Sequence, residues 1–384
     1  MAPRRSPAMA LEAALEERRV LIACGSGGVG KTTTAAALAL RAALDGRRVL
    51  VCTIDPSRRL ATSLGKGQLS GRPRAIDIKA FAPARGGALF AMMLDVKGAF
   101  DALVLRHTPE GPARDRILKN RFYQQVSAAL AGSHEYIAME KLLELASDDR
   151  FDLVVLDTPP TRHALDFLEA PDRLLGFLDV SVLRFFLRPY FKAGRLTMQV
   201  ATRTGAMLLK LADRFLGLQF LQELSEFFLA FEGMYDGFRA RASDVQALLR
   251  APGTGFVLVA GPQPPALEEA LYFHKRLVEK KLGFVAFVVN RVHLDPARER
   301  GRSGPQVRLA SGLAARLAQT LREQQVLARV ERQAIARLEV DTRDKPLLVP
   351  ELEQDVHDLR GLLAFAALVF PRGREEARAA GVSR

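Results

Sequence analysis

The sequence predicts an α/β fold, a doubly wound and mostly parallel sheet that carries an α-helical insertion. Two observations predict this class. Short apolar runs of strand length alternate along the chain with segments of helical periodicity. Several of these runs are apolar on both faces, which is typical of parallel strands that helices cover on both sides. The 384 residues and 48% hydrophobic content suit one domain with a large insertion, or two domains.

The predicted elements follow one another from the N-terminus. A buried strand is expected at 18–24, and the Ala- and Leu-rich stretch 32–46 after it has helical spacing and ends in glycine. A further helix is expected at 265–282. The other stretches predicted as strands are 47–54, 88–94, 151–158, 255–261 and 283–292. Because no internal repeat is visible, we expect one such core rather than a tandem pair.

The turn between the first strand and its helix reads "GSGGVGKT" and fits the pattern G-x-x-x-x-G-K-[ST]. Its glycines allow backbone N–H groups to turn toward phosphate oxygens, and the helix N-terminus favours anions. Lys31 is then placed to reach the β- and γ-phosphates of ATP, and the Thr32 hydroxyl to bind Mg²⁺. The alternative is a glycine-rich turn without a ligand. The expected nucleotide-binding residues of this loop are Gly25, Ser26, Gly27, Gly28, Val29, Gly30, Lys31, Thr32 and Thr33.

Two aspartates stand where strands end. Asp157 closes the run "FDLVVLD" and is predicted to hold Mg²⁺ through water; the alternative is an aspartate that caps a following helix. The next residues, 158–163, are predicted to sense the γ-phosphate. Asp55 follows the second strand, and its carboxylate is predicted to orient the attacking water, so that Asp55 and Lys31 are the expected catalytic residues. An Asx-type turn with Pro56 is the alternative for Asp55.

The segment 172–249 contains no convincing strand and is predicted to be an α-helical insertion that Pro189 and Gly194 interrupt. Ten of the chain's 22 phenylalanines lie between residues 173 and 238. Such a pattern suits an ordinary buried helical pair. It also suits a hydrophobic groove for an apolar partner, such as a membrane-protein client. Pattern alone does not separate the two.

Charge and cysteine content narrow the class of protein. A net charge of +13 fits binding to nucleic acid or anionic lipid, but the basic residues are mostly arginines spread along the chain, and no nucleic-acid-binding motif accompanies them. No signal peptide and no apolar run of about 18 residues is present, so no membrane span is expected. Cys24 and Cys52 are expected to be reduced thiols of a cytoplasmic protein, and the absence of CxxC excludes a structural zinc site.

Five motifs together resemble the ArsA/Get family of dimeric P-loop ATPases, over about residues 18–365. They are "GGVGKTT", "DPSRRL", "DTPPTRHALDFLEAP", "VVNRV" and "PLLVPEL", in this order. The resemblance implies a dimer that Mg-ATP opens and closes. It also implies Asp55 as the water-orienting residue, Asn290 as an adenine contact, and the segment from Pro346 to Pro350 as a loop over the base.

The resemblance also implies a division of the chain. A SIMIBI-type P-loop core would comprise 18–171 and 250–370, after an N-terminal extension at 1–17. The helical segment 172–249 would be the client or effector subdomain. The polar tail 371–384 is expected to be disordered.

Ser26 departs from the family pattern, in which a lysine at this place reaches across the dimer to the partner's phosphates. Two arrangements would restore a cation. Another basic residue, Arg58, Arg59 or Arg162, would act within a homodimer. Alternatively, the chain would form a heterodimer with a lysine-bearing paralogue, which the otherwise intact loop favours. The insertion also lacks cysteines that would bind arsenite or antimonite, so a metalloid pump subunit is not expected.

Three functions are consistent with these features. The first is an ATPase whose ATP-driven dimer closure is coupled to the handling of an apolar client, with membrane-protein targeting as one such task. The motifs and the Phe-rich segment favour this function. The second is a positioning ATPase of the ParA/MinD type, which the net charge supports but the absence of a C-terminal amphipathic helix opposes. The third is a metabolic P-loop transferase, for which no acceptor-site motif is visible.

Overall fold

The structure is a computed structural model that describes residues 6–55, 59–81, 86–107, 111, 114, 120, 133–159, 235–295 and 311–370. Most of the expected insertion, the tail 371–384 and the expected site residues Arg58, Arg162 and His163 lie outside these residues. The chain divides into two compact units, and each is described by itself. The first comprises Met1–Leu94, Glu144–Leu165 and Leu248–Arg384, and the second Asp95–Leu143 and Asp166–Ala247.

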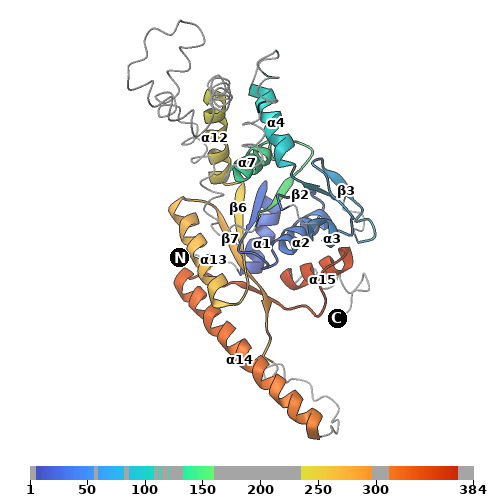
Figure 1. The fold of residues 1–384 in the computed structure, drawn as a ribbon, viewed down its shortest axis with the longest axis vertical. Coiled ribbons are helices and arrows are strands. Elements are labelled where there is room, and N and C mark those ends of the chain that lie inside the picture. Colours follow the sequence, from blue (N-terminus) through green and yellow to red (C-terminus); the bar gives the residue numbers. More distant parts are fainter. Residues whose placement is uncertain are drawn as a thin grey trace, which may run out of the picture. The chain divides into compact units, whose positions relative to one another are not determined.

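The first unit contains an eight-stranded sheet in the order β3-β4-β2-β5-β1-β6-β7-β8. Figure 1 shows this sheet with its helices and labels β2, β3, β6 and β7. All neighbouring strands are parallel except β3, which runs antiparallel to β4. The strands are β1 (Val20–Cys24), β2 (Arg48–Thr53), β3 (Arg74–Ile76), β4 (Ala88–Met93), β5 (Leu153–Asp157), β6 (Thr254–Ala260), β7 (Phe284–Val292) and β8 (Leu347–Pro350). The six predicted strands and the α/β fold class are confirmed. The two edge strands, β3 and β8, were not expected.

Helices of the described chain alternate with these strands. They are α1 (Pro7–Glu17), α2 (Lys31–Leu44), α3 (Arg59–Ser63), α4 (Val96–His107), α7 (Ser133–Ala146), α12 (Tyr235–Arg250), α13 (Pro264–Glu279), α14 (Ser311–Thr342) and α15 (Leu359–Val369). The expected helices at 32–46 and 265–282 correspond to α2 and α13. The expected N-terminal extension contains α1. None of the described helices is long and apolar enough to cross a membrane.

Helix α2 is the centre of the core. Nearly all of its residues are buried, because α1, α15 and the sheet surround it. The run "AAALALRAAL" suits this position, since alanine is a strong helix former and its small side chain lets neighbouring elements approach closely. Strands β1 and β5 are likewise buried along their whole length. These two strands and α2 therefore form a rigid support for the loop that joins β1 to α2.

Helix α13 packs on the opposite face of the sheet, where the His274 ring lies 5.2 Å from the ring of Phe287 on β7. The long helix α14 packs against α13. Only its C-terminal half contributes buried residues, whereas residues 312–320 are exposed.

Two arginines hold the N-terminal edge of the sheet together through backbone carbonyls. Arg19 donates from Nε to the carbonyl of Ala146 and from Nη2 to that of Asp148, each at 2.8 Å. Arg47 donates to the carbonyl of Arg18 at 2.9 Å and also to that of Leu15. Buried carbonyls need such donors. The edge of the sheet opposite the loop between β1 and α2 is thereby fixed.

The second unit contains α4 and most of α7 and α12. Glu140 of α7 is buried and accepts a hydrogen bond from Nε of Arg241 on α12 at 2.7 Å. The same carboxylate lies 3.8 Å from Nη1 of Arg106 on α4. One buried carboxylate thus joins three helices that are far apart in the sequence, since a buried charge is stable only when it is paired.

Candidate functional site

The loop from Gly25 to Thr32 joins the carboxyl end of β1 to the N-terminus of α2, as expected. Gly25 and Gly30 have φ angles of +154° and +94°, which other residues rarely adopt. A Cβ atom on Gly25 would lie 1.9 Å from the carbonyl oxygen of Val259, and one on Gly30 would lie 2.2 Å from Nδ2 of Asn290. Backbone therefore approaches backbone and amide closely here, and only glycine fits at these two positions.

Asn290 of β7 is buried and donates from Nδ2 to the carbonyl oxygen of Val29 at 3.0 Å. The Asn290 side chain packs against Gly30 and so supports the loop. Its expected contact with adenine stays a prediction.

Lys31 is the first residue of α2, and its side chain is folded toward the loop. Nζ donates to the carbonyl oxygen of Ser26 at 2.7 Å. Burial lowers the pKa of Lys31, whereas the carboxylate of Asp157 acts in the opposite direction. A buried ammonium group at the N-terminus of a helix, inside a ring of backbone N–H groups, is suited to bind a polyphosphate.

Asp157 stands at the carboxyl end of β5 and is fully buried. Its Oδ2 accepts hydrogen bonds from the hydroxyl of Thr32 at 2.8 Å and from that of Thr53 at 2.9 Å. Its Oδ1 is buried without a hydrogen-bond partner in the described chain. Burial raises the pKa of this carboxyl to about 6. A buried carboxylate with one unpaired oxygen beside two hydroxyls fits the hard oxygen ligands that Mg²⁺ prefers.

Thr53 was not expected in the site, although the sheet register explains its place. It pairs with Asp157 across β2 and β5, just as Ala23 of β1 pairs with Asp157 from the other side. The sequence signal was its position at the end of a predicted strand, two residues before Asp55.

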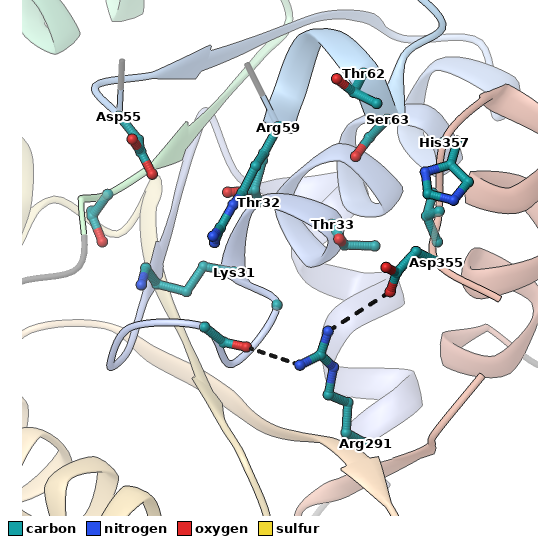
Figure 2. A pocket seen from close by; sticks show the side chains of 14 residues that line it. Lys31, Thr32, Thr33, Asp55, Arg59, Thr62, Ser63, Arg291, Asp355 and His357 are labelled. Atoms are coloured by element: carbon teal, nitrogen blue, oxygen red, sulfur yellow. Dashed lines mark hydrogen bonds and ion pairs between the residues drawn. The ribbon is translucent and has the colours of Figure 1, made fainter. Parts of the chain in front are cut away.

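A cavity of about 490 Å³ opens above the loop (Figure 2). It is lined by Gly28, Gly30, Lys31, Thr32, Thr33, Asp55, Arg59, Thr62, Ser63, Thr158, Arg291, Asp355, Val356 and His357. Five of the nine expected loop residues and Asp55 thus line one cavity, whereas Gly25, Ser26, Gly27, Val29 and Asp157 are not part of its lining. The negative charge of Asp55 also acts on Lys31, so the carboxylate lies within electrostatic range of the ammonium group. Residues 160–163 of the expected sensing loop lie beyond the described part of the chain.

The far side of the cavity is formed by residues that the sequence analysis missed. Arg291 has a φ angle of +59°, and its guanidinium lies 3.9 Å from Oδ1 of Asp355 and 3.5 Å from the carbonyl oxygen of Gly28 (Figure 2). His357 lies on the same wall. The only sequence signal for Arg291 was its place next to Asn290, and the only one for Asp355 and His357 was their place shortly after the motif "PLLVPEL".

Pro346 and Pro350 flank and end β8 and do not line the cavity. The chain reaches the cavity five residues later, at Asp355. The expected contact of the two prolines with the base stays a prediction.

Cys24 and Cys52 are free and buried, as expected. Burial raises the pKa of the Cys24 thiol to about 12, so it is not a reactive group at neutral pH. Among the described residues no group of His, Cys, Asp and Glu could hold a metal ion in a protein cage of its own.

Comparison with known proteins gives this site its context. The family model "Anion-transporting ATPase" matches residues 18–308, which is most of the chain. The chain is 31% identical over 150 residues to "ATPase GET3" of Malassezia globosa, covering 39% of this chain and 41% of that protein. It is 32% identical over 156 residues to "ATPase ASNA1 homolog" of Babesia bovis, covering 40% of this chain and 39% of that protein.

A longer match extends to "ATPase ASNA1 homolog 2" of Paramecium tetraurelia, with 27% identity over 274 residues, 70% of this chain and 74% of that protein. The first two relatives are thus matched over about two fifths of their length, and the third over about three quarters. The matched region begins at the strand that leads into the phosphate-binding loop. The chain therefore belongs to the anion-transporting ATPase family.

Proposed function

We propose that this chain binds Mg-ATP in the cavity above the loop and hydrolyses it to ADP and phosphate. The observation that carries the proposal is the cluster of Lys31, Thr32 and Asp157. A buried ammonium group, a hydroxyl and a carboxylate with one unpaired oxygen lie together where the glycine loop enters α2. This set matches the groups that hold a nucleotide triphosphate and its metal in phosphoryl transfer.

The residues of this chain divide the work between them. The loop N–H groups and Lys31 bind the β- and γ-phosphates, and Asn290 keeps the loop in shape by holding Val29. Bound Mg²⁺ would neutralise charge on the phosphates. Thr32 and Asp157 would hold it. Asp55 faces the same cavity and would accept a hydrogen bond from the attacking water and so orient it.

The far wall is suited to the nucleoside. Arg291, Asp355 and His357 offer donors and acceptors at the end of the cavity away from Asp55, where ribose and base would lie. Asn290 and the Pro346–Pro350 segment would contribute to this end only if they moved toward the ligand.

We further propose that ATP binding closes a dimer and that this closure controls the handling of an apolar client, with membrane-protein targeting as one such task. Support comes from family membership and from the phenylalanines of 172–249, most of which lie outside the described residues. Polar substitutions at both Phe185 and Phe186, or at both Phe227 and Phe228, should then abolish client association and spare ATP binding.

Two variants test the ATPase proposal. Lys31→Ala should bind Mg-ATP weakly and lose turnover, because the buried cation at the phosphates is gone. Asp55→Asn should bind ATP normally but hydrolyse it about 10²–10³-fold more slowly, because only the orientation of water is lost. Calorimetry and phosphate release measure the two properties separately. Lys66→Ala, an exposed lysine outside the cavity, serves as the matched control. Undiminished hydrolysis by Lys31→Ala would rule out this site.

A further inference from the structure

Among the described residues, the arginines and lysines that line the cavity are Lys31, Arg59 and Arg291. Two of them have an opposite charge close by. Arg291 approaches Asp355, and the charge of Asp157 acts on Lys31. The third, Arg59, forms no ion pair with a carboxylate in the part of the chain that the structure describes.

Arg59 begins α3, and Figure 2 shows its guanidinium directed into the cavity on the side of Lys31 and Thr32. Its positive charge acts on Lys31: the pKa of Lys31 is lowered mainly by burial, and Arg59 adds to this effect. Two cations that face one another in a cavity repel, and a bound polyanion removes the repulsion. In Figure 2 the guanidinium lies on the side of Lys31 and Asp55 and away from His357, so the arginine is directed to the phosphate end rather than the nucleoside end.

We propose that Arg59 is a catalytic residue that binds the γ-phosphate of ATP from within the same chain, an inference that rests on the ATPase function proposed above. In the reaction the water oxygen forms a bond to the γ-phosphorus. The bond from that phosphorus to the bridging oxygen breaks, and its electron pair goes to ADP. The proton of water ends on phosphate or solvent. Arg59 stays protonated and neutralises the charge that develops on the γ-phosphate oxygens.

Arginine suits this task because its planar guanidinium donates two parallel hydrogen bonds to phosphate oxygens and keeps its charge at any physiological pH. The assignment also bears on Ser26, whose neutral side chain brings no charge to a facing site. A cation supplied by α3 makes each site complete within its own chain. Of the three arginines considered from the sequence, Arg59 is the one that lies within the described residues, and a cation from Arg59 removes the need for a lysine-bearing partner.

The first experiment compares binding of ADP with binding of a non-hydrolysable ATP analogue. Arg59→Ala should bind Mg-ADP as the unchanged protein does, lose the extra affinity for the analogue, and turn over ATP about 10²–10³-fold more slowly. Arg59→Lys should recover part of the affinity for the analogue and part of the turnover. Arg59→Gln replaces Arg59→Ala if the alanine variant has a lowered melting temperature. Arg72 is an exposed arginine outside the cavity, so Arg72→Ala is the matched control. It should change neither the affinity for the analogue nor the turnover of ATP.

Failure of this inference differs from failure of the ATPase proposal. If the unchanged protein neither binds nor hydrolyses Mg-ATP, the ATPase proposal is wrong. If it does both, and Arg59→Ala keeps its turnover or loses ADP as well as ATP, then Arg59 does not act on the γ-phosphate.

A mixing experiment separates action within one chain from action across a dimer. Lys31→Ala retains Arg59 but lacks the phosphate-binding lysine, and Arg59→Ala has the reverse defect. If Arg59 acted in the partner's site, a mixed dimer would contain one complete site, and the mixture would regain turnover. We expect the mixture to be as inactive as its components. Recovery of turnover on mixing would overturn the assignment to the same chain.

Discussion

At the scale of single residues, Asp157 shows how the site is built at the expense of stability. Its side chain is fully buried, and one carboxylate oxygen lacks a hydrogen-bond partner among the described residues. Burying a carboxylate in this way costs free energy, which is why the pKa of Asp157 rises to about 6. Thr32 and Thr53 recover a part of this cost through two hydrogen bonds to the other oxygen.

Asp157→Asn should therefore stabilise the protein in the absence of Mg²⁺ and nucleotide. The pKa rises from 3.8 in the unfolded chain to about 6, so the folded state binds more protons between these values. Stability of the unchanged protein thus falls as pH rises through this window and stays low above it. At pH 7.5 the variant should gain at most about 3 kcal/mol, at 1.36 kcal/mol for each pKa unit.

Urea unfolding at pH 7.5 and pH 5, followed by circular dichroism, measures the gain. It should shrink at the lower pH, because Asp157 is then largely protonated in the folded state. Asp149→Asn, at an exposed position, should show no such dependence. A variant that is less stable at pH 7.5 would mean that the Asp157 carboxylate is well compensated in the protein.

At the scale of elements, His293 fastens the end of β7 to its surroundings. Its Nδ1 lies 2.7 Å from Oε1 of Glu331 on α14, and its backbone N–H donates to Oε2 of Glu331 at 2.9 Å. Its Nε2 lies 3.1 Å from Glu351, the residue after β8. The same strand end carries Arg291, so these contacts link α14 and the segment after β8 to one wall of the cavity above the loop.

His293→Ala should lower the free energy of unfolding by about 3 kcal/mol, because it removes a partner from the buried carboxylate of Glu331. Glu331→Gln should lower the free energy of unfolding by less, since the amide keeps an acceptor and is uncharged. Glu323→Ala, exposed on the same helix, should change stability by less than about 0.5 kcal/mol. Thermal and urea unfolding measure these differences. Equal stability of His293→Ala and the unchanged protein would show that Glu331 finds another partner.

At the scale of the whole molecule, the open question is how many chains make one working site. Lys31, Thr32, Asp55, Arg59 and Asp157 of a single chain already supply cations, hydroxyls and carboxylates to one cavity or directly beneath it. This makes hydrolysis by the isolated chain the expected behaviour. Dimer closure would then serve client handling more than the supply of a missing charge.

The purified chain should hydrolyse ATP without a second kind of subunit, and Ser26→Lys should change its turnover little, because Arg59 already provides the cation. Light scattering with Mg-ATP and phosphate release give mass and rate from one preparation. A chain that is inactive alone and becomes active when a lysine-bearing homologue from the same cell is added would instead support the heterodimer that the sequence favoured.

The sequence by itself determined the parts of this protein that depend on neighbouring residues. The glycine loop with Lys31 and Thr32 is contiguous, and six strands are short apolar runs, several of them apolar on both faces, so both could be recognised from pattern. Strands β3 and β8 could not, because three or four residues at a sheet edge carry too little pattern.

Only the tertiary structure decided which distant residues share the site. Thr53 meets Asp157 because parallel strands β2 and β5 are in register, although 104 residues separate them. Asn290 reaches the loop at Val29 across 261 residues of sequence. Arg291 and the segment from Asp355 to His357 become a wall of the cavity for the same reason. Sheet order and register bring such side chains to one edge, and those relations arise from packing between strands, which no local pattern records.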